Sequence, residues 1–533
     1  MIAAPESPDR TEASDPEHDA WVLRLRTSSY RKLAFLVHAG AGYTCTRFVL
    51  LRLLGLVYLA SFASAATQIV PLLGPEGLLP ATSYLDRAVA EAGSRLDAFL
   101  RVPSLFLWLP PSEKALLGTC WLGVALAIAV LCGATNALLQ LLLWALHLSL
   151  IKIGQLFYGY GWEIQLAETG FLAIFLCPLG SVSPRGASPP PVIVIWLFRW
   201  LIARIMLGAG LIKLRGDPCW RDLTCLVYHY ETQPIPSPLS WIWHHAPRDV
   251  HRMGVLFNHL VELVAPFFAF GPQRARWVAG GLFVVFQAAL IASGNLSFLN
   301  WLTIIPAIAC FDDELMKKLL PRKLSLWLSD EMPAEPSRPH RIGAAGLLVV
   351  VLGLSVDPVV NLISPRQVMN TSFDALALVN SYGAFGSVGR ERYEAILSGR
   401  RGSSEEDDAS WLAYELPCKP GDIHRRPCFL TPWHLRLDWQ IWFAAQSDIE
   451  RQPWLVHLAY KLLSGDPAVK QLFAVDPFPD SPPRFIRAEL YRYEFTRPGE
   501  EGWWKRTYVG EYLRPIALED RTLRSFMRAQ GWK

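Results

Sequence analysis

Long apolar runs alternate with short polar stretches between residues 46 and 364. A helix needs roughly 20 apolar residues to cross about 30 Å of hydrocarbon. Nine runs reach or approach that length, at 48–70, 115–133, 136–153, 168–180, 192–213, 255–271, 277–293, 296–310 and 342–364. The run 168–180 is too short to cross by itself, so it crosses with the preceding WEIQLAE or dips in and returns. The pattern predicts an α-helical multi-pass membrane bundle of about nine hydrophobic segments over 46–364.

The periodicity changes after residue 365. RAELYRYEFTR (487–497) and KRTYVGEYL (505–513) alternate as strands do, whereas WLVHLAYKLL (454–463) and RTLRSFMRAQ (521–530) have helical spacing. We therefore expect residues 365–533 to form a separate mixed α+β domain outside the bilayer.

Composition agrees with a membrane protein and argues against a nucleic-acid partner. Of the 533 residues, 52% are hydrophobic and 18% are charged, whereas soluble proteins average about 25% charged. Lipid takes the place of surface charge, so membrane lipid is an expected partner. The net charge of +4 is mild and no dense basic run occurs, so we expect no nucleic acid to bind.

The positions of lysine and arginine predict the orientation, because short positively charged loops stay in the cytoplasm. The segment 1–45 is polar and lacks the order of a cleavable signal peptide. If all nine runs cross, this segment and the loop 311–341 lie inside. The loops 71–113 and 214–253 and the domain 365–533 then lie outside, in the lumen of the endoplasmic reticulum for a eukaryote or in the periplasm for a bacterium. The loop 214–253 carries four arginines against this trend.

Two cysteine pairs fall on the predicted outer, oxidising side. Cys219 and Cys225 lie in RGDPCWRDLTC, and Cys418 and Cys428 lie in LPCKPGDIHRRPC. We predict a disulfide in each pair, although two pairs of free thiols remain the alternative. The other five cysteines lie in or beside apolar runs and are interpreted as core residues, namely Cys45, Cys120, Cys132, Cys177 and Cys310.

Several ionisable residues lie within or beside the apolar runs, where a charge costs roughly 2.5 to 3.5 kcal/mol. They are Glu163, Glu168, Arg199, Arg204, Lys213, His259 and Glu262. Acidic and basic residues in adjacent runs predict buried ion pairs that fix the order of the helices. The alternative is that they line a substrate cavity or supply a catalytic base.

No chemistry is evident elsewhere in the sequence. His229, His244, His245 and His251 lie in one outer loop, but the adjacent pair lacks the i, i+4 spacing of a helical zinc site. The aromatic setting WIWHHAP suits a membrane interface. The sequence contains no nucleophile elbow, phosphate-binding glycine loop or zinc-protease motif. We therefore predict no metal site, no catalytic residue and no cofactor.

The runs RGDPCWRDLTC (215–225) and PGDIHRRPC (420–428) are similar to those of the lipase maturation factor family. The resemblance continues in GWEIQLAETGFLAIFLCPL (161–179) and SGNLSFLNWLTIIPAIACFDD (293–313), and it covers most of the chain from about residue 46. The apolar runs also resemble, much more faintly, the group that includes the vitamin K-dependent γ-carboxylase.

The resemblance implies a membrane-resident maturation factor, with a chaperone-like role and no enzymatic activity. Members of this family assist the folding and assembly of secreted homodimeric lipases, such as lipoprotein lipase, in the endoplasmic reticulum. The fainter resemblance implies an alternative, a membrane-embedded enzyme that acts on a lipid or a membrane-bound substrate through a polar cavity. A wide pocket lined by the ionisable residues would favour the enzyme, and mutual pairing of those residues would favour the scaffold.

Two further features concern the predicted outer domain. Trp433, Trp503 and Trp504 have the composition of a partner-binding surface, and burial in the domain core or at the membrane interface is the alternative. Asn370, in N-T-S, is a predicted glycosylation site if the host is a eukaryote. Asn295, in N-L-S, fits the same pattern but lies close to an apolar run.

Overall fold

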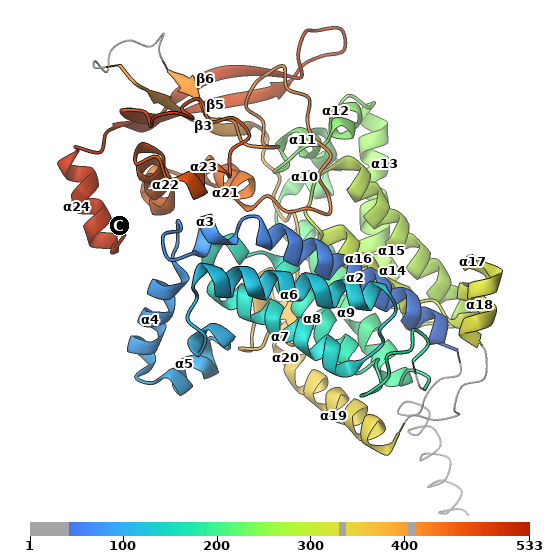
Figure 1. The fold of residues 1–533 in the computed structure, drawn as a ribbon. Coiled ribbons are helices and arrows are strands. Elements are labelled where there is room, and N and C mark those ends of the chain that lie inside the picture. The colour runs from blue at the N-terminus through green and yellow to red at the C-terminus, as the bar shows by residue number, and fades with distance from the viewer. Residues whose placement is uncertain (1–41, 187, 330–336, 403–410, 533) are drawn as a thin grey trace, which may run out of the picture.

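The computed structural model describes residues 42–186, 188–329, 337–402 and 411–532. Most of the predicted segment 1–45 therefore lies outside the described residues. A helical bundle forms one part of the molecule, and a part with a β-sheet lies across one end of it (Figure 1).

The bundle is built by helices in the first two thirds of the chain. They are α2 (Thr44–Ala66), α3 (Ile69–Leu73), α4 (Ala81–Ala92), α5 (Arg95–Arg101), α6 (Glu113–Leu131), α7 (Ala137–Ile153), α8 (Gly161–Ile174), α9 (Val192–Arg215), α13 (Arg248–His259), α14 (Ala265–Phe268), α15 (Gln273–Ser293), α16 (Leu299–Ile308), α17 (Asp313–Leu319), α18 (Arg322–Ser329), α19 (Arg338–Leu354) and α20 (Val356–Ile363).

Among the described residues, five helical stretches are long and apolar enough to cross a membrane. They are Thr44–Ala66, Glu113–Leu131, Val192–Arg215, Gln273–Ser293 and Arg338–Ile363, the last joining α19 to α20. Two further apolar helices, Ala137–Ile153 and Leu299–Ile308, are shorter. Each of the nine predicted runs falls on helical residues, but the run 168–180 forms only the end of α8, which is 14 residues long. A multi-pass helical protein is thus shown, whereas nine spans are not confirmed.

Burial differs strongly among these helices and identifies the centre of the bundle. The most apolar window of α9 is 83% buried inside the protein, against 28% for α15 and for the α19–α20 stretch. A helix that is apolar on all sides is either enclosed by protein or faces lipid. We infer that α9 is the central helix and that α15 and α19 turn much of their surface to lipid.

The helix that follows the outer loop contains a π-helical turn. α13 continues into a π-turn at Leu260–Val264 before α14 begins. Pro266 stands in the first turn of α14 and has no N–H to donate to the carbonyl four residues earlier, at Glu262. The missing hydrogen bond explains why the helical ladder shifts there. Glu262 consequently lies in an irregular turn.

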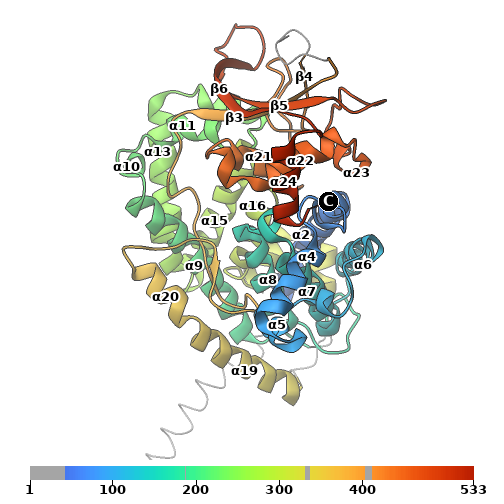
Figure 2. The same ribbon diagram turned by 90° about the vertical axis from the view of Figure 1, so that its left-hand side faces the viewer.

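The C-terminal part contains a four-stranded antiparallel sheet of order β4-β3-β5-β6. Its strands are β3 (Arg392–Arg400), β4 (Leu412–Ala413), β5 (Phe485–Phe495) and β6 (Trp504–Ile516). Its helices are α21 (Arg436–Ala444), α22 (Pro453–Leu463), α23 (Pro467–Lys470) and α24 (Arg521–Gln530). α21 and α22 lie between the sheet and the bundle (Figure 2). The predicted alternating runs form β5 and β6, and the two predicted helices are confirmed as α22 and α24.

A second, two-stranded sheet lies against the bundle instead of joining the larger sheet. It pairs β1 (Thr371–Ser372) with β2 (Asn380–Ser381) in antiparallel register, and β2 contacts α8, α9 and α20. The residues directly after the last membrane stretch therefore belong to the bundle by packing. The larger sheet begins only at β3.

The predicted outer loop 214–253 packs on the larger sheet. It contains α10 (Pro218–Arg221), α11 (Cys225–Thr232) and α12 (Pro238–His244). The Trp241 indole donates to the Thr496 carbonyl at 2.9 Å, and Glu231 accepts the backbone N–H of Phe495 at 2.7 Å. The loop and the sheet consequently form one body on the same side of the bundle.

Both predicted cysteine pairs are joined as disulfides in the structure, Cys219 to Cys225 and Cys418 to Cys428. Four of the remaining cysteines are buried, as expected for core residues. Cys132 is exposed, so its assignment to the core was wrong. It directly follows α6, where the chain leaves the packed helix.

Candidate functional site

All seven predicted ionisable residues make polar contacts with other groups of the protein. Three clusters account for most of them, and two of these clusters join the bundle to chain segments beyond residue 365. We call this contact region the junction, defined by Glu163, Glu168, Arg204, Asn380, Tyr382 and Arg436.

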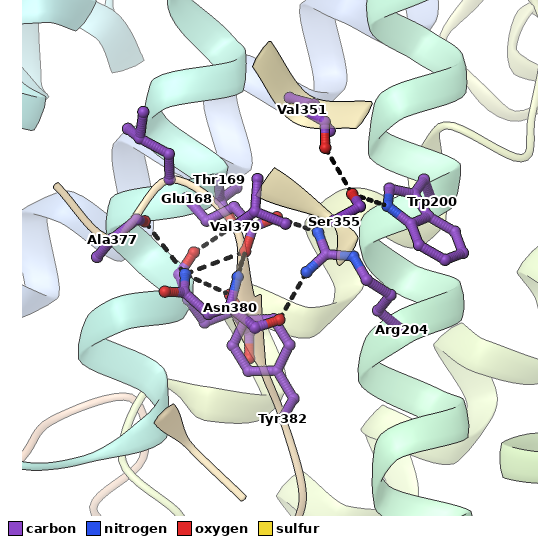
Figure 3. A network of polar contacts seen from close by, with 12 residues as sticks. Glu168, Thr169, Trp200, Arg204, Val351, Ser355, Ala377, Val379, Asn380 and Tyr382 are labelled. Atoms are coloured by element: carbon purple, nitrogen blue, oxygen red, sulfur yellow. Dashed lines mark hydrogen bonds and ion pairs between the residues drawn. The ribbon is translucent and has the colours of Figure 1, made fainter. Parts of the chain in front are cut away.

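The first cluster centres on Glu168 of α8, which is 1% exposed (Figure 3). One carboxylate oxygen pairs with the Arg204 guanidinium of α9. The other accepts three hydrogen bonds, from the Asn380 backbone N–H at 3.0 Å, the Asn380 amide at 3.1 Å and the Tyr382 hydroxyl at 2.7 Å. Arg204 also donates to the Asn380 carbonyl at 2.6 Å. A buried ion pair is stable only when its remaining lone pairs and protons are satisfied. Asn380 and Tyr382 supply most of these bonds here, while the Arg204 Nε atom has no hydrogen-bond partner among the described residues.

Small residues on α9 allow the β2 segment to approach this closely. A Cβ at Gly208 would collide with the Tyr382 carbonyl oxygen, and one at Gly216 would collide with the Gly386 carbonyl oxygen. The glycines of GAGLIKLRG (208–216) therefore allow the backbone of residues 382–386 to contact α9, in addition to any role in helix packing.

The second cluster joins Glu163 to Arg436, a residue that the sequence analysis did not single out. Both side chains are fully buried, and the guanidinium and carboxylate are 2.8 Å apart. Arg436 also donates to the Phe157 carbonyl at 2.6 Å and lies 3.4 Å from the centre of the Tyr158 ring. The only sequence signal was a basic residue between two leucines in HLRLDW (434–439). Its partner could not be identified without the fold.

The surroundings of Arg436 extend the contact to the end of α2. The Gln68 side chain donates to the His434 carbonyl at 2.7 Å and accepts the Arg436 N–H at 2.8 Å. Burial, reinforced by the neighbouring Arg436, holds the pKa of His434 well below its usual range. The imidazole is therefore neutral, and Arg436 is the cation that neutralises Glu163.

The third cluster lies within the bundle. Lys213 of α9 contacts Glu262 of the π-turn at 2.5 Å, and the Asn258 amide donates to the other Glu262 oxygen at 2.9 Å. The Lys213 ammonium also lies 5.1 Å from the centre of the Trp220 ring. Asn258 and Glu262, four residues apart on the same face, thus hold a paired lysine.

The two remaining predicted residues bind backbone carbonyls. Arg199 donates to the Ala309 carbonyl and to the Tyr43 hydroxyl, each at 2.8 Å. A ring nitrogen of His259 lies 3.0 Å from the Trp220 carbonyl. These bonds are suited to fixing helix positions, although the other ring nitrogen of His259, Nδ1, is buried and has no hydrogen-bond partner among the described residues.

A cavity of 710 Å³ lies between the bundle and the outer part. Its walls come from α8, α9, α11, α13, α15, α16, α21 and residues 369–370 and 382–387, and we call it the junction cavity. Of the seven predicted ionisable residues, only Lys213 and Glu262 line it, and they are paired to each other. The arrangement favours a scaffold over a catalytic pocket.

The outer histidines do not assemble into a metal site within the described ranges. There, the only grouping of potential ligands close enough to hold an ion is Asp217 with Cys219 and Cys225. The two cysteines are joined to each other, which removes both thiolates. Burial lowers the pKa of His244 to about 4, and its ring lies 3.7 Å from Glu231.

The three predicted partner-binding tryptophans differ in exposure. Trp433 and Trp503 are half-buried. Trp504 is 2% exposed and stacks on Phe495 with ring centres 4.2 Å apart. The prediction of an exposed Trp504 is wrong, because adjacent strand residues point to opposite faces and this one faces the core.

The two sequons also differ. Asn370 is exposed and adopts a positive φ of 56°. Asn295 is 1% exposed, and its amide donates to the Cys428 carbonyl at 2.9 Å. A glycan on Asn295 is incompatible with this fold, whereas Asn370 stays a predicted site.

Two family descriptions match this chain. "Lipase maturation factor transmembrane domain" matches residues 45–318, and "Lipase maturation factor C-terminal domain" matches residues 378–514. The second match begins within the segment that packs on the bundle.

Named relatives are similar over nearly the whole chain. Lipase maturation factor 1 of Bos taurus is 46% identical, covering 98% of this chain and 96% of the relative. Lipase maturation factor 1 of Homo sapiens is 44% identical, covering 99% and 94%. Lipase maturation factor 2 of Rattus norvegicus is 31% identical, covering 90% and 84%. No solved structure matches this chain.

Proposed function

This chain belongs to the lipase maturation factor family, and on that basis we propose that it helps secreted homodimeric lipases to fold and assemble at the membrane of the endoplasmic reticulum. The observation that carries the proposal is the mutual pairing of the buried charges. Glu163 and Glu168 neutralise cations and bind groups of the C-terminal part, so the bundle holds the outer domain in a fixed position. A folding factor needs such a rigid platform more than it needs a reactive group.

The alternative of a membrane-embedded enzyme is not supported. The relatives are named as maturation factors. Five of the seven ionisable residues lie outside the junction cavity, and the other two are paired to each other. Each of these ionisable side chains binds a specific group of the protein, which is the role expected of a structural residue.

The proposed orientation has the outer loop 214–253 and the C-terminal domain in the lumen. Two observations support it. The loop and the domain form one body, and each contains a disulfide, a bond that persists in oxidising compartments. Lys317 and Lys318 of α17 follow Asp313, which binds the backbone N–H of Cys45 at the start of α2. A basic segment at that end of α2 fits a cytoplasmic face.

We propose that the client lipase contacts the outer domain near Trp503. This side chain is half-buried and lies edge-on to Trp241 of the outer loop, with ring centres 6.0 Å apart. Next to it, β6 is an edge strand, and residues 505–509 are exposed along it. Aromatic and basic side chains at such a place are typical of binding hot spots. We propose Trp433 as a second candidate contact for the client.

The test is complementation of cells that lack their own maturation factor, with secretion of an active homodimeric lipase as the readout. The wild-type chain should restore secretion. Trp503→Ala should reduce secretion while the protein level and melting temperature stay normal. Trp504→Ala is the matched control, because it removes a core ring and should lower the melting temperature first. Full rescue by a stable Trp503→Ala variant would move the client surface elsewhere.

A chain truncated after residue 364 tests the need for the outer domain less cleanly. Truncation removes Arg436 and leaves Glu163 buried without its cation. An unpaired buried charge costs about 3 to 5 kcal/mol. We expect the truncated chain to fail in rescue, and its persistence in the membrane must be measured before the failure is assigned to client binding.

A further inference from the structure

The lining of the junction cavity is mostly apolar, with a polar end at α9, α11 and α13 and a second polar set on α8, α15 and α16, where Gln165 bonds to Thr303 and Asn300 bonds to Gln287. Its apolar wall comes from membrane helices and from α21, and it includes Met206, Phe257, Phe286, Leu290 and Trp439. Its polar end is formed by Lys213, His229, Asn258 and Glu262. A cavity with this division suits an amphipathic molecule whose chain lies along the apolar wall.

The polar end carries no net charge. The Lys213 ammonium and the Glu262 carboxylate cancel each other at 2.5 Å, and Asn258 binds both of them. A charged head group would compete with this pair and would leave one of its members unpaired. The occupant of such a site should therefore have an uncharged head.

His229 offers a hydrogen-bonding group that the fold does not use. Its side chain is 5% exposed, lines the cavity and makes no hydrogen bond to any described residue. The ring lies edge-on to Phe385, with centres 4.7 Å apart. Burial, reinforced by Lys213, lowers the pKa of His229 to about 4, so the imidazole can both donate and accept hydrogen bonds at neutral pH.

Irregular backbone gathers around the same cavity. Glu262 lies in the π-turn, and π-turns are frequent at functional sites. Asn370 and Phe385 also line the cavity, and they adopt positive φ angles of 56° and 52°. Asparagine tolerates this left-handed region, whereas a phenylalanine there is strained, and strained residues persist where the surrounding structure holds them, commonly at ligand sites.

The cavity is the size of a single lipid chain. At about 30 Å³ per small heavy group, its 710 Å³ holds roughly 24 such groups. A helical protein segment about 10 Å wide and only 15 Å long already fills more than about 1,000 Å³. A helical segment of the client is therefore too large for this space.

We propose that the junction cavity binds one single-chain lipid with an uncharged, hydroxyl-bearing head group, of the monoacylglycerol type, taken up from the surrounding membrane. Its head group bonds to His229 and to the polar atoms beside Asn258, and its chain lies between α9, α13 and α15. The occupant would fill the space between the bundle and the outer domain and so stiffen the platform. This assignment does not depend on the client being a lipase.

The experiment uses the full chain in lipid nanodiscs and a monooleoylglycerol probe with a photoreactive diazirine in its acyl chain. Cross-links should map to cavity-lining peptides of α9, α13 and α15, and excess unlabelled monooleoylglycerol should suppress them. Ala289 and Ala288 are adjacent exposed residues of α15, but only Ala289 lines the cavity. Ala289→Trp should reduce labelling about tenfold, whereas Ala288→Trp should leave it within about twofold.

The head group is tested by competition and by one further variant. Unlabelled monooleoylglycerol should compete at least tenfold better than oleate or oleylamine. His229→Phe keeps an aromatic ring but removes its hydrogen bonds, and it should weaken binding about three- to tenfold. Three results would overturn the proposal. They are labelling that Ala289→Trp does not reduce, cross-links confined to the lipid-facing sides of α6 and α19, and equal competition by the charged lipids. The wild-type cross-link map decides the site even if a variant fails to fold.

Discussion

Replacing Glu168 by glutamine should release the segment that follows the last membrane helix. In the native protein this carboxylate accepts bonds from Arg204, Asn380 and Tyr382 within a fully buried site. Glutamine keeps the shape but removes the charge and adds an N–H₂ group that faces other donors. Breaking a buried ion pair from one side costs about 3 to 5 kcal/mol, because the remaining charge stays uncompensated.

A second substitution tests whether loss of the Glu168 carboxylate charge causes this destabilisation. Tyr382→Phe removes one neutral donor at 2.7 Å from that carboxylate, and a hydrogen bond to a charged group contributes about 1.5 to 3 kcal/mol. In the Glu168→Gln background the same change should cost less than about 1 kcal/mol, because the charged acceptor is gone. The two substitutions should therefore be strongly non-additive.

The measurement is unfolding of the purified protein in mixed micelles of increasing denaturing detergent, followed by tryptophan fluorescence. Limited proteolysis of residues 366–391 provides a second readout, since this segment should become accessible in Glu168→Gln. Tyr393→Phe is the matched control, because its hydroxyl binds Glu391 at the protein surface, and it should leave the unfolding midpoint unchanged. Additive effects of Glu168→Gln and Tyr382→Phe would refute the buried-cluster reasoning.

Three shorter predictions follow from other parts of the molecule. Replacing both Cys418 and Cys428 by serine should destabilise the outer domain by about 3 kcal/mol, measured as a lower melting temperature under non-reducing conditions. Burial lowers the pKa of His457 to about 4, below its unfolded value near 6.5. The unfolded state therefore binds more protons between about pH 4 and pH 6.5. About 3 kcal/mol of folding stability should be lost as the pH falls across this range. His457→Asn should make stability less dependent on pH there. In a eukaryotic host, Asn370→Gln should abolish the mobility shift caused by endoglycosidase, while Asn295→Gln should not change it.

The sequence alone determined the features that depend on local pattern. Apolar runs of sufficient length must form helices in lipid, because a backbone without water has to satisfy its own hydrogen bonds. Alternation identified β5 and β6, and helical spacing identified α22 and α24. The two disulfides followed from cysteines that are near in the chain and predicted on the oxidising side. The family resemblance rested on short polar motifs between the runs.

Only the tertiary structure decided the features that depend on which distant groups meet. Glu163 was a candidate from its position, but its partner Arg436 lies in the outer domain, and no spacing rule connects them. Trp503 and Trp504 have the same residue type, and the orientation of β6 against the rest of the domain decides which one is buried. The cavity beside the π-turn arises from packing among several helices. Local periodicity reports which residues prefer apolar surroundings, whereas the identity of the neighbours is set by the three-dimensional arrangement of the whole chain.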